Sequence, residues 1–197
     1  KKQFQAKIKT SIIITVILFQ LIIFGIVIVL PGTGLKISLS TSGLGILLFH
    51  FFNNLIRGSL GEELGWRGFA QNELQKKHSP LISSLIIGVL WGFWHAPLWL
   101  VSGYKGIELI QYIGVFLLGI ISVSIIISYF YKLTENLLMP IIIHQMFNFL
   151  IAITSGELLN VLTYTCFGYF ILAVILIIVN PREILYNRDS RNESVEI

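Results

Sequence analysis

The feature that most constrains the fold is a series of long apolar segments. The first, at 11–30, reads SIIITVILFQLIIFGIVIVL and carries no ionisable side chain. About twenty apolar residues in a helix are enough to cross the hydrocarbon core of a bilayer. Inside a bilayer the backbone N–H and C=O groups must bond within the protein, which a helix achieves. With a mean hydropathy of +0.82, the sequence predicts an all-α fold, a polytopic membrane bundle of about six helices.

The segment boundaries come from charges and turn-forming residues. The second predicted helix continues as a polar helix to about Lys77, because no helix breaker occurs before Ser79-Pro80. We expect a single transmembrane domain over 1–180, with the motifs described below at 43–155, and a polar cytoplasmic tail at 181–197. The predicted membrane helices lie at about 11–30, 43–60, 80–101, 108–130, 136–154 and 158–179.

The distribution of basic residues predicts the orientation. Cytoplasmic loops carry an excess of lysine and arginine. With the N-terminus inside, only Lys36 and Lys105 fall outside, and Arg57 lies within a span. The cytoplasmic set is Lys1, Lys2, Lys7, Lys9, Arg67, Lys76, Lys77, Lys132, Arg182, Arg188 and Arg191. We therefore expect a multi-pass protein of the cell membrane with both termini cytoplasmic. Its expected surroundings are membrane lipids. The bias of basic residues explains the net charge of +4, so no nucleic-acid partner is needed.

Polar residues interrupt the apolar sequence in three places: EELGWRGF at 62–69, WGFWHAPLW at 91–99 and PIIIHQMFN at 140–148. An ionisable group inside a membrane span costs about 3 kcal/mol on insertion scales, so each such group is a candidate for a functional site.

The two adjacent glutamates have different predicted roles. Glu63 and Arg67 are four residues apart and can form an ion pair along one helix face. Glycines recur at helical spacing along this segment, at positions 58, 61, 65 and 68. Such a stripe favours close packing of another helix. At about 100° per residue, Glu62 lies about 80° from the centre of the stripe, and the ion pair lies opposite. We predict a structural Glu63–Arg67 pair and a Glu62 that faces the packed side. A carboxylate wetted at the membrane interface is the alternative for Glu62.

The histidines lie on two further helices. His95 shares a helix face with Trp91, and a histidine alone on such a face is also compatible with simple core packing. His144 and Asn148 are four residues apart and stack one turn apart on one face. A polar pair of this kind can also hold two membrane helices together by hydrogen bonds.

Together these groups contain the components of hydrolysis by water. A glutamate can act as general base on a water molecule. Imidazole and carboxamide N–H groups can stabilise the oxyanion of a tetrahedral intermediate. A carboxylate, two imidazoles and a carboxamide on three helices therefore favour a hydrolase over a scaffold.

With these motifs the chain resembles the CPBP intramembrane proteases, the family of CAAX proteases and bacteriocin-processing enzymes, over about 43–155. Three motifs carry the resemblance in the family's order: Glu62-Glu63-x-x-x-Arg67 for Glu-Glu-x-x-x-Arg, Trp91-x-x-x-His95 for Phe-x-x-x-His with Trp in place of Phe, and His144-x-x-x-Asn148 for His-x-x-x-Asn.

The resemblance implies a helical intramembrane endopeptidase with Glu62 as general base and His95 positioning the water. His144 and Asn148 would form the oxyanion site, and the glutamate–arginine ion pair would be structural. The implied substrates are peptides or prenylated peptides that reach the site near the cytoplasmic face.

Two alternatives stay open at this point. Glu62, His95 and His144 would make a His₂Glu set like that of catalytic zinc sites, so zinc is possible although no cofactor is certain. We favour chemistry without a metal, because Asn148 suits an oxyanion site better than zinc. The family's roles also include bacteriocin processing and self-immunity, so a non-enzymatic immunity or scaffold protein is the alternative to a protease.

Overall fold

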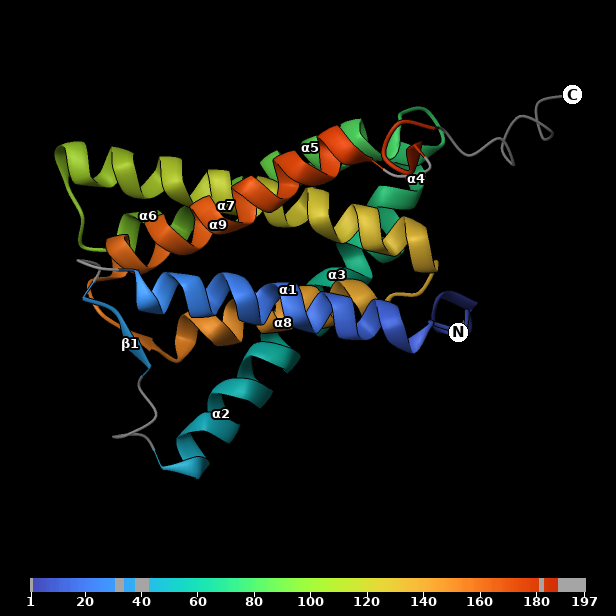
Figure 1. The fold of residues 1–197 in the computed structure, drawn as a ribbon. Coiled ribbons are helices and arrows are strands. Elements are labelled where there is room, and N and C mark those ends of the chain that lie inside the picture. The colour runs from blue at the N-terminus through green and yellow to red at the C-terminus, as the bar shows by residue number, and fades with distance from the viewer. Residues whose placement is uncertain (1, 31–33, 38–42, 181–182, 188–197) are drawn as a thin grey trace, which may run out of the picture.

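The computed structural model describes residues 2–30, 34–37, 43–180 and 183–187, and the structural statements below concern these residues. They form an all-α bundle with one short two-stranded ladder (Figure 1). The α-helices are α1 (Thr10–Val29), α2 (Leu44–Asn54), α3 (Gly61–Gly65), α4 (Gln71–Gln75), α5 (Pro80–Trp94), α6 (Ala96–Val101), α7 (Gly106–Thr134), α8 (Leu138–Ala152) and α9 (Leu158–Val179). The remaining elements are the 3₁₀-helix η1 (Lys2–Phe4), the π-helices η2 (Leu55–Leu60) and η3 (Trp66–Ala70), and the strands β1 (Lys36–Ile37) and β2 (Thr154–Ser155).

The predicted all-α membrane bundle is confirmed. Each of the six predicted ranges contains helix, and the fourth extends four residues further than expected, to Thr134. The fifth, predicted at 136–154, is shorter, because α8 ends at Ala152 and Thr154 belongs to β2. Among the described helices, α1, α7 and α9 are long and apolar enough to cross a membrane, and α5 and α8 are shorter apolar helices. The predicted tail at 181–197 lies outside the described residues except for 183–187.

The range 80–101, predicted as one helix, is divided into α5 and α6 at His95. Pro97 lies in the first turn of α6. A proline has no N–H to donate, and its ring would collide with the carbonyl four residues earlier, so it favours a new helix start. His95 itself has φ −87° and ψ 3°, outside regular helical geometry. The break therefore places this histidine at a corner between two helices.

Helix α7 forms the centre of the bundle, with α5 and α9 packed against it. Both approaches depend on glycine. A Cβ at Gly88 of α5 would lie 2.9 Å from the Cα atom of Ile121 in α7, and a Cβ at Gly119 of α7 would lie 2.3 Å from Cys166 of α9. These contacts fix the positions of α5 and α9, which contribute Trp91, Leu162 and Cys166 to the wall of the cavity at the candidate site.

A small ladder and a helix cap order the end of the bundle where α9 begins. Lys36 of β1 pairs with Ser155 of β2 in antiparallel register. Glu157 follows and caps α9 by accepting the N–H groups of the first turn. A hydrogen bond from the Tyr104 hydroxyl, 2.5 Å long, lowers the pKa of Glu157 below its ordinary value. Burial, together with this carboxylate, raises the pKa of Tyr104 to about 12.

Candidate active site

The helix that carries the two glutamates is continuous but irregular. It runs from α2 through η2, α3, η3 and α4, so the predicted polar extension beyond residue 60 is confirmed. The short α3, with Glu62 and Glu63, lies between the two π-helical segments. Such π-bulges inside α-helices occur frequently at functional sites. Their wider turns also change the direction in which each following side chain points.

The predicted ion pair is confirmed, and it is part of a larger buried network. Arg67 Nη1 lies 2.9 Å from Glu63 Oε1, and both side chains are fully buried. The other guanidinium nitrogen, Nη2, donates to Ser124 of α7 at 3.1 Å. The guanidinium carbon lies 4.7 Å from the ring centroid of Trp91. Glu63 Oε1 also lies 2.8 Å from Nδ1 of His144.

The predicted packing face was wrong for half of the glycine stripe. Gly58 and Gly68 lie close to Asn148 and Leu137. Gly61 and Gly65 are exposed, and a Cβ at Gly65 would have no neighbour within 4 Å. The packed side instead holds Glu63 and Arg67, and Glu62 is only partly buried. A helical wheel with 100° steps misplaces these residues because a π-helical turn takes more residues than an α-turn. The buried network to α7 then determines which face is covered.

Glu62 has a hydrogen-bond donor that the sequence analysis did not identify. The indole Nε1–H of Trp91, a fully buried residue of α5, donates to Glu62 Oε2 at 2.5 Å. The other oxygen and the Asn148 amide both lie near Gly58: a Cβ at Gly58 would lie 3.9 Å from Glu62 Oε1 and 3.3 Å from Asn148 Nδ2. The absence of a side chain at Gly58 therefore keeps open the space between the carboxylate and the carboxamide.

Three of the four predicted catalytic residues line one cavity of about 300 Å³, namely His95, His144 and Asn148. Glu62 is not a lining residue, and it meets the cavity wall through Trp91. The remaining wall is mainly apolar. The lining residues are Asn54, Trp91, His95, Leu98, Phe116, Ile120, His144, Phe147, Asn148, Ile151, Ala152, Leu162 and Cys166.

The hydrogen bonds of the two histidines define which ring nitrogens hold protons. His95 Nδ1 lies 2.8 Å from the carbonyl oxygen of Trp91, which can only accept a hydrogen bond. Nδ1 therefore carries the proton, and Nε2 of the neutral ring is an acceptor. His144 Nδ1 faces the Glu63 carboxylate in the same way. Nε2 of His144 therefore donates only when the ring is an imidazolium.

The described residues do not assemble the zinc-binding set considered above. Nowhere in the described part of the chain do three His, Cys, Asp or Glu side chains converge so that they could hold a metal ion. The Glu62 carboxylate is bonded to the Trp91 indole and is not among the residues that line the cavity shared by His95 and His144. These three side chains are therefore not assembled as a His₂Glu set in this arrangement, and no step of the reaction proposed for this chain involves a metal.

Two serines of α7 that hold the site helix were not predicted from the sequence. Ser124 and Ser128 of α7 are four residues apart, as are their partners Arg67 and Gln71. Gln71 Nε2 donates to Ser128 Oγ at 2.9 Å. Residues four apart lie on one helix face, so this matching spacing could have indicated the contact. It was not apparent because serines are common in membrane helices.

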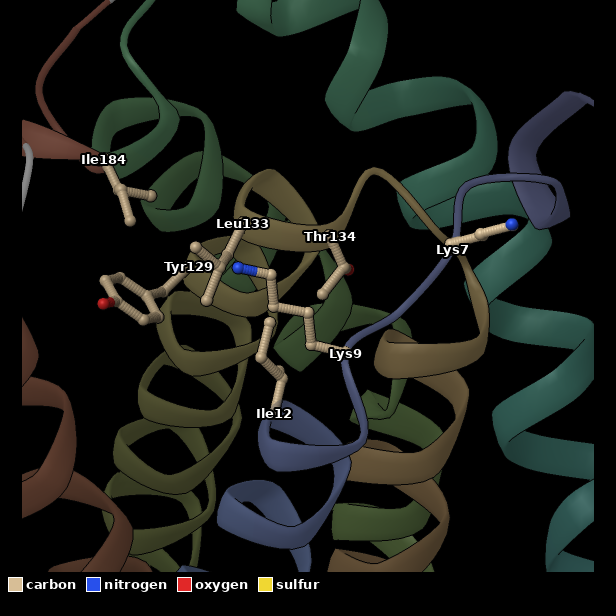
Figure 2. A pocket seen from close by; sticks show the side chains of 7 residues that line it. All are labelled: Lys7, Lys9, Ile12, Tyr129, Leu133, Thr134 and Ile184. Carbon is tan, nitrogen blue, oxygen red and sulfur yellow. The ribbon is translucent and has the colours of Figure 1, made fainter.

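A second cavity, of about 440 Å³, lies at the end of the bundle where α1 begins and α7 ends (Figure 2). Lys9 and Thr134 contribute polar groups, and Ile12 and Leu133 contribute apolar ones. None of the four predicted catalytic residues lines it. The chemistry of the motifs therefore belongs to the smaller cavity.

The fold and site define a helical membrane protein with a buried ionic network beside a cavity of polar and apolar groups. A model of the family described as "Type II CAAX prenyl endopeptidase Rce1-like" matches residues 43–150, which contain all three motifs. The chain belongs to this family, which is one of intramembrane endopeptidases. CAAX prenyl protease 2 of Methanococcus maripaludis is similar, with 35% identity over 109 residues. That match covers 51% of this chain and 40% of the relative.

Proposed function

We propose that this chain is an intramembrane endopeptidase that hydrolyses a peptide bond with a water molecule activated by Glu62. The observation that carries the proposal is the position of Glu62. Its carboxylate is oriented by Trp91 and lies across Gly58 from Asn148, beside a cavity that His95 and His144 also line.

In the proposed reaction, Glu62 accepts a proton as the water oxygen attacks the scissile carbonyl carbon. His95 Nε2 accepts a hydrogen bond from the same water and holds it in place. The resulting oxyanion accepts hydrogen bonds from Asn148 Nδ2 and from the imidazolium of His144. Glu62 then returns its proton to the leaving nitrogen as the C–N bond breaks, which yields a carboxylic acid and an amine.

Glu63 and Arg67 support this reaction without touching the substrate. Glu63 holds the ring of His144 through Nδ1, and Arg67 neutralises the charge of Glu63. Ser124 fixes the guanidinium from α7. Because Glu63 is held by Arg67 and bonds His144 Nδ1, it keeps the imidazole in one orientation. A third group that orients the catalytic histidine is a common feature of such sites.

The substrate that we propose is a peptide carrying a prenylated cysteine near its C-terminus. The Methanococcus relative is named as a CAAX prenyl protease, and the family description is that of a prenyl endopeptidase. In such peptides the cysteine of a C-terminal C-a-a-X sequence carries the lipid. The apolar walls of the cavity, with Phe116, Ile120 and Leu162, suit the aliphatic side chains of this sequence.

We further propose a multi-pass protein with both ends on the cytoplasmic side. The N-terminal segment and the end of α9 lie at the same end of the bundle (Figure 1). Gln3 and Ala6 of this segment bond to Leu137 and Asn136 between α7 and α8. The basic residues of the sequence fall mainly in the segments predicted on the same side of the membrane as the N-terminus, as expected for a cytoplasmic face.

The proposal is tested with purified full-length chain in liposomes and a farnesylated Cys-Ala-Ala-Met peptide carrying a fluorophore and a quencher on either side of the scissile bond. We expect cleavage by the wild type and a loss of about 10²–10⁴-fold in Glu62→Gln, the range for a positioned general base. Cleavage by Glu62→Gln at the wild-type rate would reject Glu62 as the base. No cleavage by the wild type itself would instead support a scaffold whose polar residues serve helix packing.

A further inference from the structure

The cavity contains one polar side chain that the proposed reaction does not use, Asn54. This residue is the last of α2 and lines the cavity together with His144 and Asn148. Its amide nitrogen is buried and has no hydrogen-bond partner among the described residues. A buried amide without a partner is unfavourable, and in a membrane bundle there is no bulk water to compensate it. The missing partner is therefore to be sought in a molecule that enters the cavity.

The contacts between the two helices place Asn54 far from Glu62. Near Glu62, Glu63 contacts His144 of α8, and one turn away Gly58 lies beside Asn148. Further toward the start of the site helix this order stops, because the Phe51 carbonyl accepts a hydrogen bond from Gln145 of α8. Asn54 lines the cavity about two turns before Glu62 on the site helix.

The distance along the helix separates Asn54 from the reacting carbonyl. Asn54 and Glu62 are eight positions apart, which corresponds to at most about 12 Å at the α-helical rise of 1.5 Å per residue, since the π-helical η2 lies between them. An extended peptide advances by about 3.3 Å per residue. A carbonyl beside Asn54 would therefore belong to a residue about three or four positions from the scissile bond. The side chains between would lie against Phe116, Ile120 and Leu162.

We propose that Asn54 binds a main-chain carbonyl of the peptide substrate through its amide N–H, as a binding residue about two helical turns from Glu62. This inference rests on the proposed peptidase function. The torsion χ2 of asparagine is broad, so the amide can turn to present its NH₂ group to a bound carbonyl. A carbonyl of a neighbouring peptide unit satisfies the donor that this chain leaves unpaired.

The melting temperature distinguishes a substrate-binding role of Asn54 from a purely structural one. If the side chain held the helix together, its removal would lower the melting temperature. Because its amide nitrogen has no partner within the described residues, we expect Asn54→Ala to melt at the wild-type temperature or slightly above it. The neighbouring Asn53 is partly buried and is not a cavity-lining residue, so Asn53→Ala is the matched control.

The test measures binding rather than cleavage. In the Glu62→Gln protein, which holds the peptide without turnover, the Kd of the farnesylated Cys-Ala-Ala-Met peptide is determined by fluorescence anisotropy. We expect Asn54→Ala in this background to weaken binding about fivefold to tenfold, the worth of one hydrogen bond. Asn53→Ala should leave the Kd unchanged.

An equal Kd for the Asn54→Ala protein, a lower melting temperature in that variant, or no binding of the peptide at all would each overturn the inference. The peptidase proposal fails separately, if the wild-type protein does not cleave the peptide, and the assignment of Glu62 as base fails if the Glu62→Gln protein cleaves at the wild-type rate. A result in which Asn54→Ala weakens binding while Glu62→Gln still cleaves would retain a peptide-binding cavity and reject the assigned base.

Discussion

The two adjacent glutamates have opposite surroundings. Glu63 is fully buried and its Oε1 atom serves both Arg67 and His144. Glu62 is only partly buried, and the indole N–H of Trp91 is the donor that the structure places on it. One carboxylate is thus committed to charge pairing inside the protein, while the other keeps an oxygen toward Asn148.

The difference shows how a membrane bundle can hold one reactive carboxylate. The face with Glu63 and Arg67 is bonded to α7 through Ser124, and Gln71 continues the contact through Ser128. This rigid side fixes the helix. Glu62 projects from another side of the same helix, where it has fewer hydrogen bonds within the protein and reaches the cavity wall at Trp91.

The largest expected effect comes from the rigid side. Arg67→Met would leave the Glu63 carboxylate buried without its cation. We expect the free energy of unfolding to fall by about 3–5 kcal/mol, the usual cost of breaking one side of a buried pair. Denaturation of the variant in detergent, followed by circular dichroism, measures this. Lys76→Met removes an exposed partner of Glu73 and should change stability by less than about 1 kcal/mol.

A loss of similar size in the two variants would show that the buried network carries no special stability. The face with Glu63 and Arg67 would then not stabilise the helix more than an exposed ion pair does.

The second largest effect is expected at Trp91, which contacts Arg67 with its ring and Glu62 with its indole N–H. Trp91→Phe keeps an aromatic ring beneath Arg67 but removes the N–H that bonds Glu62. A hydrogen bond to a charged group contributes about 1.5–3 kcal/mol, so cleavage should slow by about 10- to 100-fold. The melting temperature should change little. Full activity of the variant, measured with the same quenched peptide, would show that the indole does not position Glu62.

The smallest effect concerns which glycine faces are packed. Gly88→Ala would force a Cβ to within 2.9 Å of the Ile121 backbone, and overpacking of this kind costs about 1–3 kcal/mol. Gly65→Ala faces open space and should be neutral or stabilising by up to about 1 kcal/mol. Thermal unfolding of both variants provides the comparison, and a greater loss in Gly65→Ala would restore the packing face predicted from the glycine stripe.

Much of the fold could be predicted from the sequence because apolar length and turn residues act locally. The helix at 158–179 was predicted with the bounds that the structure gives it. The pairing of Glu63 with Arg67 followed from four-residue spacing. The break at His95 was missed although Pro97 signals it, because the apolar run continues through the proline.

Contacts between distant helices could not be predicted in this way. The bond from Trp91 to Glu62 joins α5 to α3, and the bond from Glu63 to His144 joins α3 to α8. Neither has a periodic signal. The wrong packing face has a physical cause as well, since no regular wheel anticipates the two π-helical segments around α3.

The most direct test of the central claim compares Glu62→Gln with Glu63→Gln, measuring both melting temperature and peptide cleavage per folded molecule. We predict that Glu62→Gln melts within a few degrees of the wild type, with cleavage reduced at least about 100-fold. Glu63→Gln should melt roughly 10 °C lower, because Arg67 loses its buried counter-charge. Wild-type cleavage by Glu62→Gln, or a stable Glu63→Gln protein with no cleavage, would contradict the assignment of the two glutamates.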